Sequence, residues 1–514
     1  MYLKMLICAP LLLAACASSP EHKQSEKRSS MTEGGSEASR DSLRPAFHFT
    51  PKSHWMNDPN GLVFYKGEYH LFYQYNPNDI VWGPMHWGHA VSQDLVHWKH
   101  LPIALYPDAL GTIFSGSAVI DWHNTAGFGP EAMVAIFSHD KDKAQQQSLA
   151  YSRDQGRNWK KYEGNPVLKT PQGSPDFRDP KVFWYGDEKG HWVMALAVKD
   201  RIHFYHSADL KNWIKASEFG LAYGSHGGVW ETPDLFELAI EGTSKRKWVL
   251  SVGINNGAPA GGSGNQYFIG DFDGKTFKPL YPRDTIVWAD YGADFYAAQS
   301  WNDLRDGRRI WIGWMNNWNY ADKIPSSGWR GAFSLPRVLS LRQSKHKIQL
   351  VQKPVSELAV LQKNHRSIRD VSVDEANAFL RELRARGFEL SATVKVDDLK
   401  NAFSVVIHTG EHETCTVSYS AKKQELSVDR SASGITGFSP DFGVVHTAPL
   451  VAENGRIHLR VFFDHTSMEV FANDGKVVFT ERLFPKNENV KIRASFSDAP
   501  VSIESLDWYD LSAL

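Results

Sequence analysis

Four short segments of similar sequence recur between residues 47 and 341, and this repetition limits the folds that the chain can adopt. Each has an aspartate in a turn-like setting and an aromatic residue a few positions later. An aspartate can accept hydrogen bonds from its own turn, and the aromatic ring can pack between sheets. The segments are Ser92-Gln93-Asp94-Leu95 before Trp98, Ser152-Arg153-Asp154 before Trp159, Ser207-Ala208-Asp209-Leu210 before Trp213 and, more loosely, Asp271-Phe272-Asp273-Gly274 before Phe277.

The spacing of these segments predicts radially arranged sheets. The four aspartates are separated by 60, 55 and 64 residues, and the stretches between them carry strand signals without long amphipathic helical patterns. A repeating region of about 300 residues with a period of about 60 gives five units. The sequence therefore predicts an all-β fold with a five-bladed β-propeller over residues 44–342 and a pocket near its axis. A β-sandwich with chance similarity between its turns is the alternative.

The last third of the chain predicts a second β domain. Residues 343–386 are charged in their second half and contain one helix-compatible stretch, Val373 to Leu383, so we expect a linker there. Further on, Ile457, Leu459, Val461 and Phe463 alternate with polar residues, as in a half-buried strand. Asn473-Asp474-Gly475 is a hairpin signal. We expect a C-terminal antiparallel β-sandwich over residues 387–514.

Composition excludes several classes of protein. Lys and Arg together number 57 and Asp and Glu 58, so the net charge of −1 argues against a partner such as nucleic acid, which is held by a basic field. The 514 residues contain only 3 cysteines, too few for a disulfide-rich scaffold. The 18 tryptophans can serve a core, an interface or a platform for sugar rings.

The N-terminus has the features of an export signal. Lys4 precedes an apolar run, Met5 to Leu13, that is too short to span a bilayer. Leu13-Ala14-Ala15-Cys16 resembles the end of a bacterial lipoprotein signal, so we expect a signal peptide at residues 1–15 and lipidation of Cys16. Residues 16–43 predict a flexible tether. The expected location is the cell envelope, outer-membrane anchored, with the lipid as the only membrane contact. An ordinary signal peptide with a chance cysteine is the alternative.

Three acidic residues are candidates for catalysis. Asp58 lies in Asn57-Asp58-Pro59-Asn60-Gly61 beside Trp55, Asp179 lies in Arg178-Asp179-Pro180, and Glu231 lies in Trp230-Glu231-Thr232-Pro233. Taken singly, each has an ordinary interpretation: an Asx-turn, a surface turn and a rim carboxylate. They are 121 and 52 residues apart, so only a fold that brings the inner strands of different blades to one axis can unite them. Glycosidases use two carboxylates that flank the bond they cleave.

Local details of these strings give two further expectations. Arg178 and Asp179 are adjacent in an extended segment, so their side chains should point to opposite faces of the sheet. Glu231 sits between apolar runs, and apolar surroundings would favour the protonated carboxyl that a general acid requires. The pairs His86/His89 and His203/His206 are poor candidates for metal ligation, because i,i+3 neighbours on a strand face opposite ways. We find no Walker-type loop and expect no metal or cofactor.

Several strings, taken in order, resemble glycoside hydrolase family 32, which contains the invertases, inulinases and levanases. The resemblance runs from about His48 to the C-terminus. The strings are Trp55-Met56-Asn57-Asp58-Pro59-Asn60-Gly61, Gln74-Tyr75-Asn76-Pro77, Trp82-Gly83-Pro84-Met85-His86-Trp87-Gly88-His89, Phe114-Ser115-Gly116-Ser117, Arg178-Asp179-Pro180, Trp230-Glu231-Thr232-Pro233-Asp234, Asp294-Phe295-Tyr296-Ala297-Ala298-Gln299, Gly313-Trp314-Met315-Asn316-Asn317-Trp318, and Leu459 to Asp464 with Glu469 to Gly475.

This resemblance implies a propeller followed by a sandwich, and a role for each matched residue. Asp58 would be the nucleophile toward a terminal β-fructofuranosyl unit, Glu231 the acid and base, and Asp179 the transition-state stabiliser that grips the sugar with Arg178. The other implied substrate-binding residues are Asn57, Gln74, Trp82, Ser115 and Trp318, with Trp55, Met56 and Phe114 as walls of the pocket. Thr232 departs from the family, which often has Cys after the acid/base glutamate; the carboxyl itself is retained.

The implied activity is that of a retaining β-fructofuranosidase that acts on fructans or sucrose. Three alternatives use the same features. A fructosyltransferase would pass the sugar to another sugar instead of water, a lipid-anchored fructan-binding protein would have lost its chemistry, and a propeller hydrolase of arabinan or xylan would also use three acids. The last of these is not expected to carry Trp-Met-Asn-Asp-Pro-Asn-Gly.

Overall fold

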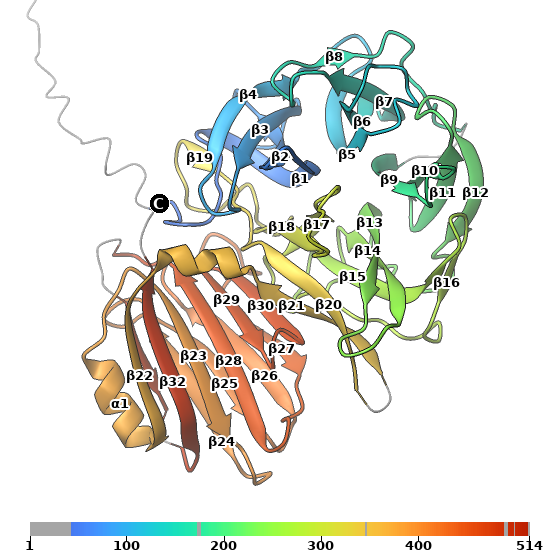
Figure 1. Ribbon diagram of the computed structural model, residues 1–514. Coiled ribbons are helices and arrows are strands. Elements are labelled where there is room, and N and C mark those ends of the chain that lie inside the picture. Colours follow the sequence, from blue (N-terminus) through green and yellow to red (C-terminus); the bar gives the residue numbers. More distant parts are fainter. Residues whose placement is uncertain (1–42, 172–175, 345–346, 488–491, 498, 512–514) are drawn as a thin grey trace, which may run out of the picture. The chain divides into compact units, whose positions relative to one another are not determined.

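Five sheets, each built on four antiparallel strands and arranged around a common axis, form the blades of a β-propeller (Figure 1). The computed structural model describes residues 43–171, 176–344, 347–487, 492–497 and 499–511, so the predicted signal peptide, the Cys16 lipidation site and nearly all of the tether lie outside the described residues. The blades are β1 (His54–Tyr65), β2 (Glu68–Asn76), β3 (His86–Ser92), β4 (Lys99–Leu105); β5 (Thr112–Asp121), β6 (Ala132–Lys141), β7 (Ala144–Ser152), β8 (Lys160–Lys161); β9 (Phe177–Tyr185), β10 (His191–Val198), β11 (Arg201–Ser207), β12 (Ile214–Phe219); β13 (Trp230–Ala239), β14 (Arg246–Ile254), β15 (Gly264–Phe272), β16 (Phe277–Pro279); and β17 (Tyr296–Ser300), β18 (Ile310–Trp314), β20 (Arg337–Gln343), β21 (Ile348–Pro354).

The ring of blades is closed by chain segments from its two ends. The short strand β19 (Trp329–Arg330) comes late in the propeller and pairs in parallel with β1, the first inner strand. The inner strand of each blade packs against the inner strand of the next, from β1 through β5, β9 and β13 to β17 and back to β1. The predicted five-bladed fold is therefore confirmed.

The sequence repeat marks the turn that leads to the outermost strand of a blade. Asp94 Oδ1 accepts hydrogen bonds from the backbone N–H groups of Val96 and His97, and the Trp98 indole N–H donates to the Leu95 carbonyl. The turns at Asp154 and Asp209 repeat this arrangement with Trp159 and Trp213, while the looser copy at Asp273 keeps the aspartate bonds only. The repeat thus encodes blade geometry rather than chemistry.

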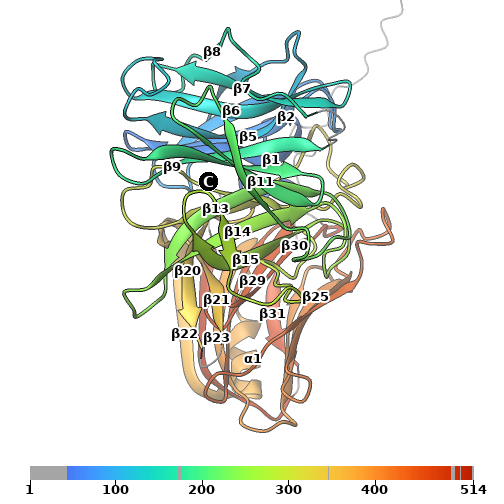
Figure 2. The same cartoon turned by 90° about the vertical axis from the view of Figure 1, so that its right-hand side faces the viewer.

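Two sheets that face one another form the C-terminal β-sandwich (Figure 2). Their inner surfaces bury one apolar core that includes Leu390, Val461 and Trp508. One sheet has the order β22-β32-β23-β28-β29-β30 and the other β27-β26-β25-β24-β31. The strands are β22 (Gln362–Ser372), β23 (Gly387–Lys395), β24 (Ala402–His408), β25 (Thr414–Ser420), β26 (Glu425–Ala432), β27 (Val445–Pro449), β28 (Arg456–Asp464), β29 (Ser467–Ala472), β30 (Val477–Arg482), β31 (Arg493–Phe496) and β32 (Ser502–Leu511).

Within the described residues, which leave out 345 and 346, the segment 343–386 is structured, and this corrects the expectation of a linker. Strand β21 pairs with β20 and completes the fifth blade, and β22 pairs with β32 inside the sandwich. A 3-10 helix, η2 (Ser356–Leu361), joins them. The predicted helix is present as α1 (Val373–Arg381), which begins with a capping box between Ser372 and Glu375. Several of the charged residues that suggested a linker lie on β22, an edge strand whose side chains are largely exposed, and others lie on or just after α1.

Buried ion pairs connect the propeller to the sandwich, and both belong to one compact unit. Arg337 on β20 is fully buried and contacts Asp290 at 3.0 Å and Glu469 of β29 at 2.6 Å. His48, before the first blade, lies between Asp464 and Glu469 at 2.7 and 3.0 Å. Within the described part of the chain, no helix is both long and apolar enough to cross a membrane.

Candidate active site

Near its first residues, the inner strand of every blade contains one more residue than the strand that pairs with it. Between two paired positions the inner strand advances by three residues while its partner advances by two, which is the signature of a β-bulge. A bulge breaks the strict alternation of a strand and re-aims its side chains. The bulged segments lie between Met56 and Pro59, Ile113 and Gly116, Arg178 and Lys181, Glu231 and Asp234, and Tyr296 and Gln299.

Three of these bulges contain the proline that follows each acidic string. Pro59, Pro180 and Pro233 have no backbone N–H to donate, and proline is tolerated at a bulge and on a sheet edge. β9 and β13 are edge strands, and β1 pairs with β19 only at His54 and Trp55, before Pro59. Asp179 adopts a left-handed backbone with φ of 65°, and Thr232 does so with φ of 46°. The proline in each string is therefore part of the device that turns the neighbouring side chain toward the axis.

The bulge overturns the expectation that Arg178 and Asp179 face opposite sides of the sheet. Both side chains line the same cavity. The left-handed φ at Asp179 reverses the chain locally, so the period of two that governs a regular strand does not hold across this pair. Asp179 is held from both sides: its N–H donates to Ser138 Oγ at 3.0 Å, and its Oδ2 accepts the Thr232 N–H at 2.9 Å.

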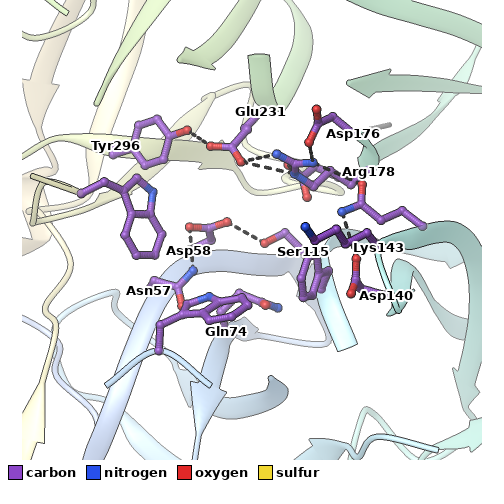
Figure 3. A pocket seen from close by; sticks show the side chains of 15 residues that line it. Asn57, Asp58, Gln74, Ser115, Asp140, Lys143, Asp176, Arg178, Glu231 and Tyr296 are labelled. Atoms are coloured by element: carbon purple, nitrogen blue, oxygen red, sulfur yellow. Dashed lines mark hydrogen bonds and ion pairs between the residues drawn. The ribbon is translucent and has the colours of Figure 1, made fainter. Parts of the chain in front are cut away.

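A cavity of about 400 Å³ opens where the five inner strands begin (Figure 3). It unites the three predicted acids, Asp58, Asp179 and Glu231, although each comes from a different blade. Most of the predicted binding residues line it as well. They are Asn57, Gln74, Trp82, Phe114, Ser115, Arg178 and Trp318.

Asp58 is half-buried in the lining of this cavity, with two hydrogen-bond donors on its carboxylate. Ser115 Oγ donates to Oδ2 at 2.7 Å, and Asn57 Nδ2 donates to Oδ1 at 3.0 Å (Figure 3). Burial raises the pKa of Asp58 to about 6, while these two hydrogen bonds oppose the rise because they favour the charged form. The carboxylate is therefore fixed in direction, and both donors favour its ionised form.

Glu231 has polar contacts on both carboxylate oxygens, which corrects the expectation of apolar surroundings. Arg178 Nη2 and Nε donate to Oε1 at 2.6 and 3.2 Å, and the Tyr296 hydroxyl donates to Oε2 (Figure 3). The apolar neighbours of Glu231 in the sequence do not surround its carboxylate. Trp230, for example, points away from the cavity and is fully buried between the blades. The position of Glu231 is thus set by a guanidinium and a phenol from two other blades.

Asp179 carries a strongly perturbed carboxyl. Burial raises its pKa to about 7, Arg178 opposes the rise, and the nearby charges of Glu231 and Asp58 add to it. Asp58, Asp179 and the Arg178 guanidinium form a coupled set, so the protonation of one carboxyl depends on the other. Such a set in a cavity is typical of a catalytic site.

Trp55 and Met56 do not line the cavity, contrary to the expectation for its walls. Both are fully buried. The Trp55 indole N–H donates to Asn57 Oδ1 at 2.8 Å, and its ring stacks on Trp318 with centroids 6.0 Å apart. Trp55 therefore stands behind the wall and orients two residues that do line the cavity.

The family models match both domains of the chain. The model described as "Glycosyl hydrolases family 32 N-terminal domain" matches residues 48–354, and that described as "Glycosyl hydrolases family 32 C terminal" matches residues 338–510. The chain belongs to glycosyl hydrolase family 32. The N-terminal match ends at Pro354, the last residue of β21, so it covers the whole propeller as the structure delimits it.

Individual relatives in family 32 are similar over nearly the whole chain. A levanase from Bacillus subtilis (strain 168) is 50% identical over 477 residues, which are 91% of this chain and 70% of that protein. The crystal structure of exo-inulinase from Aspergillus awamori superposes with a TM-score of 0.84 at 34% identity, covering 92% of this chain and 98% of that one. The β-fructofuranosidase from Schwanniomyces occidentalis, complexed with fructosyl-erythritol, gives a TM-score of 0.84 at 32% identity, covering 91% and 98%.

The family 32 site also contains residues that the sequence analysis did not assign. Tyr296 is the first residue of β17, and it completes a pattern in which every blade supplies a cavity residue from its inner strand. The string Asp294-Phe295-Tyr296, which the sequence analysis matched to the family without assigning a role, was the signal that could have indicated it. The remaining four come from the β6–β7 hairpin and the entry to β9, where no motif distinguishes them: Asp140, Lys143, Gln145 and Asp176. Asp176 Oδ1 accepts a hydrogen bond from Arg178 Nη1 at 2.6 Å.

Proposed function

We propose that this family 32 hydrolase is a retaining β-fructofuranosidase that removes terminal fructosyl units from fructans, levan or inulin, and from sucrose. The observation that carries the proposal is the convergence of Asp58, Asp179 and Glu231, from three blades, on one small cavity. The names of the relatives, levanase, exo-inulinase and β-fructofuranosidase, support the same class of substrate. Release from the chain end is supported by the relatives that are named exo-inulinases.

In the first proposed step, Asp58 acts as the nucleophile. Its carboxylate attacks the anomeric carbon of the fructosyl unit, while Glu231 in its protonated form gives a proton to the glycosidic oxygen. The bond between that carbon and the glycosidic oxygen breaks, and the rest of the substrate leaves as an alcohol. A fructosyl ester of Asp58 remains. The hydrogen bonds from Ser115 and Asn57 aim the carboxylate and hold it ionised.

In the second proposed step, Glu231 acts as a base. Now a carboxylate, it takes a proton from a water molecule, whose oxygen attacks the anomeric carbon from the side that the leaving group vacated. Asp58 departs as a carboxylate and Glu231 is protonated again, so both groups return to their starting forms. Two inversions at the same carbon give net retention of the anomeric configuration.

The other cavity residues would bind and orient the sugar. Asp179 and Arg178 would grip fructose hydroxyls, and the carboxylate of Asp179 would stabilise the positive charge that develops at the ring. Trp82, half-exposed at the mouth, packs edge to face with Phe114 at 6.0 Å and offers a surface to the next sugar unit. These steps use only carboxyl, guanidinium and hydroxyl groups, so they require no metal or organic cofactor.

Hydrolysis of levan, inulin and sucrose, with chain-length analysis of the products, tests the proposal. Free fructose should be the first product from all chain lengths, and proton NMR at early times should detect the β-anomer before it equilibrates. The Asp58→Asn variant should lose activity by at least about 10³-fold while the protein stays folded, because a carboxamide is a poor nucleophile. An α-anomer as first product, or normal turnover by Asp58→Asn, would contradict the mechanism. Oligosaccharides longer than the substrate would indicate a transferase instead.

We further propose that the protein is exported and anchored in the cell envelope through a lipid on Cys16. The support is the signal-like order of Lys4, the apolar run and Leu13-Ala14-Ala15-Cys16. In a bacterial host, metabolic labelling with an alkyne-tagged palmitate should mark the protein, and Cys16→Ala should remove the label. Equal labelling of the Cys16→Ala variant would refute the anchor.

A further inference from the structure

A second cavity, of about 660 Å³, lies where the same inner strands end. Its lining includes Leu235, Phe236 and Glu237 from the last part of β13, whereas Glu231 lies at the start of that strand. Six residues of extended strand span about 20 Å, so the two cavities open at opposite mouths of the propeller. Its volume falls within the usual range for ligand sites and exceeds that of the catalytic cavity. No step of the proposed mechanism uses it.

Flat aromatic side chains from three blades line this second cavity. Trp122 follows β5, Trp184 and Tyr185 end β9, and Trp248 lies on β14. The Trp122 ring is 37% exposed and is held in place from two sides. Its indole N–H donates to Asp303 Oδ1 at 2.8 Å, and the Arg305 guanidinium lies 4.3 Å from its ring centroid. A fixed, exposed indole loses little freedom when a ring stacks on it.

The second cavity contains both acidic and basic side chains, and part of their capacity for ion pairs and hydrogen bonds is unused within the described residues. Arg309 donates to the Trp301 carbonyl at 3.0 Å and to Ser300 Oγ at 3.4 Å, and neither it nor Asp303 forms an ion pair within the described residues. Asp303 accepts from the Trp122 indole and the Ile120 N–H. Across the cavity, Arg246 pairs with Glu237 at 2.5 Å. Balanced charges of this kind offer donors and acceptors without attracting a strongly charged ligand.

We propose that this cavity is a second, non-catalytic carbohydrate-binding site, which holds a neutral oligosaccharide segment. A sugar ring presents C–H groups on its faces and hydroxyls at its edge, so it matches aromatic platforms bordered by a guanidinium and a carboxylate. That the segment is fructan rests on the function proposed above. Because the two sites face opposite ways, the second one would keep a polymer near the enzyme and raise the effective concentration of chain ends.

Affinity electrophoresis of the full chain tests this site. Native gels that contain levan or inulin slow a protein that binds the polymer, and the dependence on polymer concentration gives a Kd. The Asp58→Asn background keeps the polymer intact during the run. Adding Trp122→Ala should weaken the Kd at least five-fold, and adding Trp122→Phe should weaken it less, because the phenyl ring still offers a face. Ile214→Ala, an exposed apolar residue of β12 outside both cavities, is the matched control and should stay within two-fold.

The outcomes separate this inference from the proposed function. If Trp122→Ala binds fructan within two-fold of its parent, the catalytic cavity accounts for all binding and the second site is refuted, while hydrolysis by the wild-type protein still stands. If wild-type protein releases no fructose from either polymer and neither gel slows Asp58→Asn, the fructan assignment of both sites is wrong. Thermal unfolding midpoints within about 3 °C of the parent confirm that the Trp122 variants are folded, and the Phe variant remains informative if Ala fails this check.

Discussion

At the scale of single residues, the surroundings of Asp58 decide how the proposed nucleophile behaves. Burial pushes its pKa upward to about 6, and the donors Ser115 and Asn57 push it back. The pKa of Asp58 therefore lies close to neutral pH, so a small shift of this pKa changes how much of the carboxyl is ionised. Any change in these two donors should move the pH dependence of the reaction rather than simply weaken substrate binding.

The Ser115→Ala variant should shift the acidic limb of the pH profile of kcat/KM to higher pH by about one unit. The Ser115 hydroxyl stabilises the carboxylate, so its removal raises the pKa of Asp58. Activity needs the ionised form, and it should consequently fail at a higher pH than in the wild type. The measurement is kcat/KM on sucrose from pH 4 to 8. Ser115→Thr, which keeps the hydroxyl, is the control. If the acidic limb of the Ser115→Ala profile is unchanged, the pKa of Asp58 does not determine that limb.

The Glu231→Gln variant should lose activity according to the leaving group. Sucrose and fructans have poor leaving groups that need protonation, so the loss should reach about 10²- to 10⁴-fold. An aryl fructoside with an activated phenol departs without a proton, and its first step should be far less affected. Rates on both substrates, compared with the wild type, provide the check. Equal losses on the two would argue against a role for Glu231 as the acid.

The residue types of the site were predictable, whereas their surroundings were not. The strings around Asp58, Asp179 and Glu231 carry unusual composition, and the resemblance to the family assigned their roles. The contacts of Glu231 were hidden, because Arg178 and Tyr296 lie 53 and 65 residues away along the chain. Thr232 illustrates the same limit: its place in the sequence was evident, but its left-handed backbone and its bond to Asp179 were not.

At the scale of elements, the β-bulge at the start of each inner strand turns side chains toward the axis, where they line the cavity. The repeat in the sequence predicted the blades because it lies in their turns, where aspartate bonding is local. The bulges depend on register with the neighbouring strand, so no local pattern reveals them. This explains why the regular alternation expected for Arg178 and Asp179 was wrong.

The Gly116→Ala variant should destabilise the protein by about 1–3 kcal/mol and lower activity. Gly116 ends the bulge of β5, next to Ser115, and a Cβ atom there would lie 2.1 Å from the Ile136 carbonyl oxygen and 2.6 Å from the Phe137 Cα. Both are main-chain atoms of β6 that cannot rotate away. Urea unfolding measures the change, and Gly437→Ala, where a Cβ meets nothing within 4 Å, is the control. Stability equal to that of the control would show that β5 can move without cost.

At the scale of the whole molecule, His48 joins the propeller to the sandwich through Asp464 and Glu469. These carboxylates raise the pKa of His48 to about 9 although burial opposes the rise. A group whose pKa is higher in the folded state stabilises the fold below its unfolded pKa of about 6.5, and this contribution disappears as the pH rises through about 9. The two domains should therefore hold together less firmly in alkali.

The His48→Gln variant tests this dependence. Between pH 6.5 and 9.5 the wild type should lose on the order of 2–3 kcal/mol of unfolding free energy at this site, whereas the variant should lose much less because glutamine does not titrate. Urea unfolding of both proteins at the two pH values gives the comparison. If the two proteins lose the same free energy, His48 does not hold its proton in the folded state.

The place of β21 has a consequence for dividing this protein. A fragment cut at residue 342, the end of the propeller predicted from the sequence, would lack the outermost strand of the fifth blade and expose the hydrogen-bonding edge of β20 to other chains. Moving the cut past Pro354 would restore that edge. It would also take Glu469 away from Arg337, which would keep only Asp290, and expose the apolar surface that Phe462, Phe471 and Val478 of the sandwich cover. Expression of the propeller alone should therefore yield insoluble material. A chimera that joins this propeller to a different C-terminal domain would first require a redesign around Arg337.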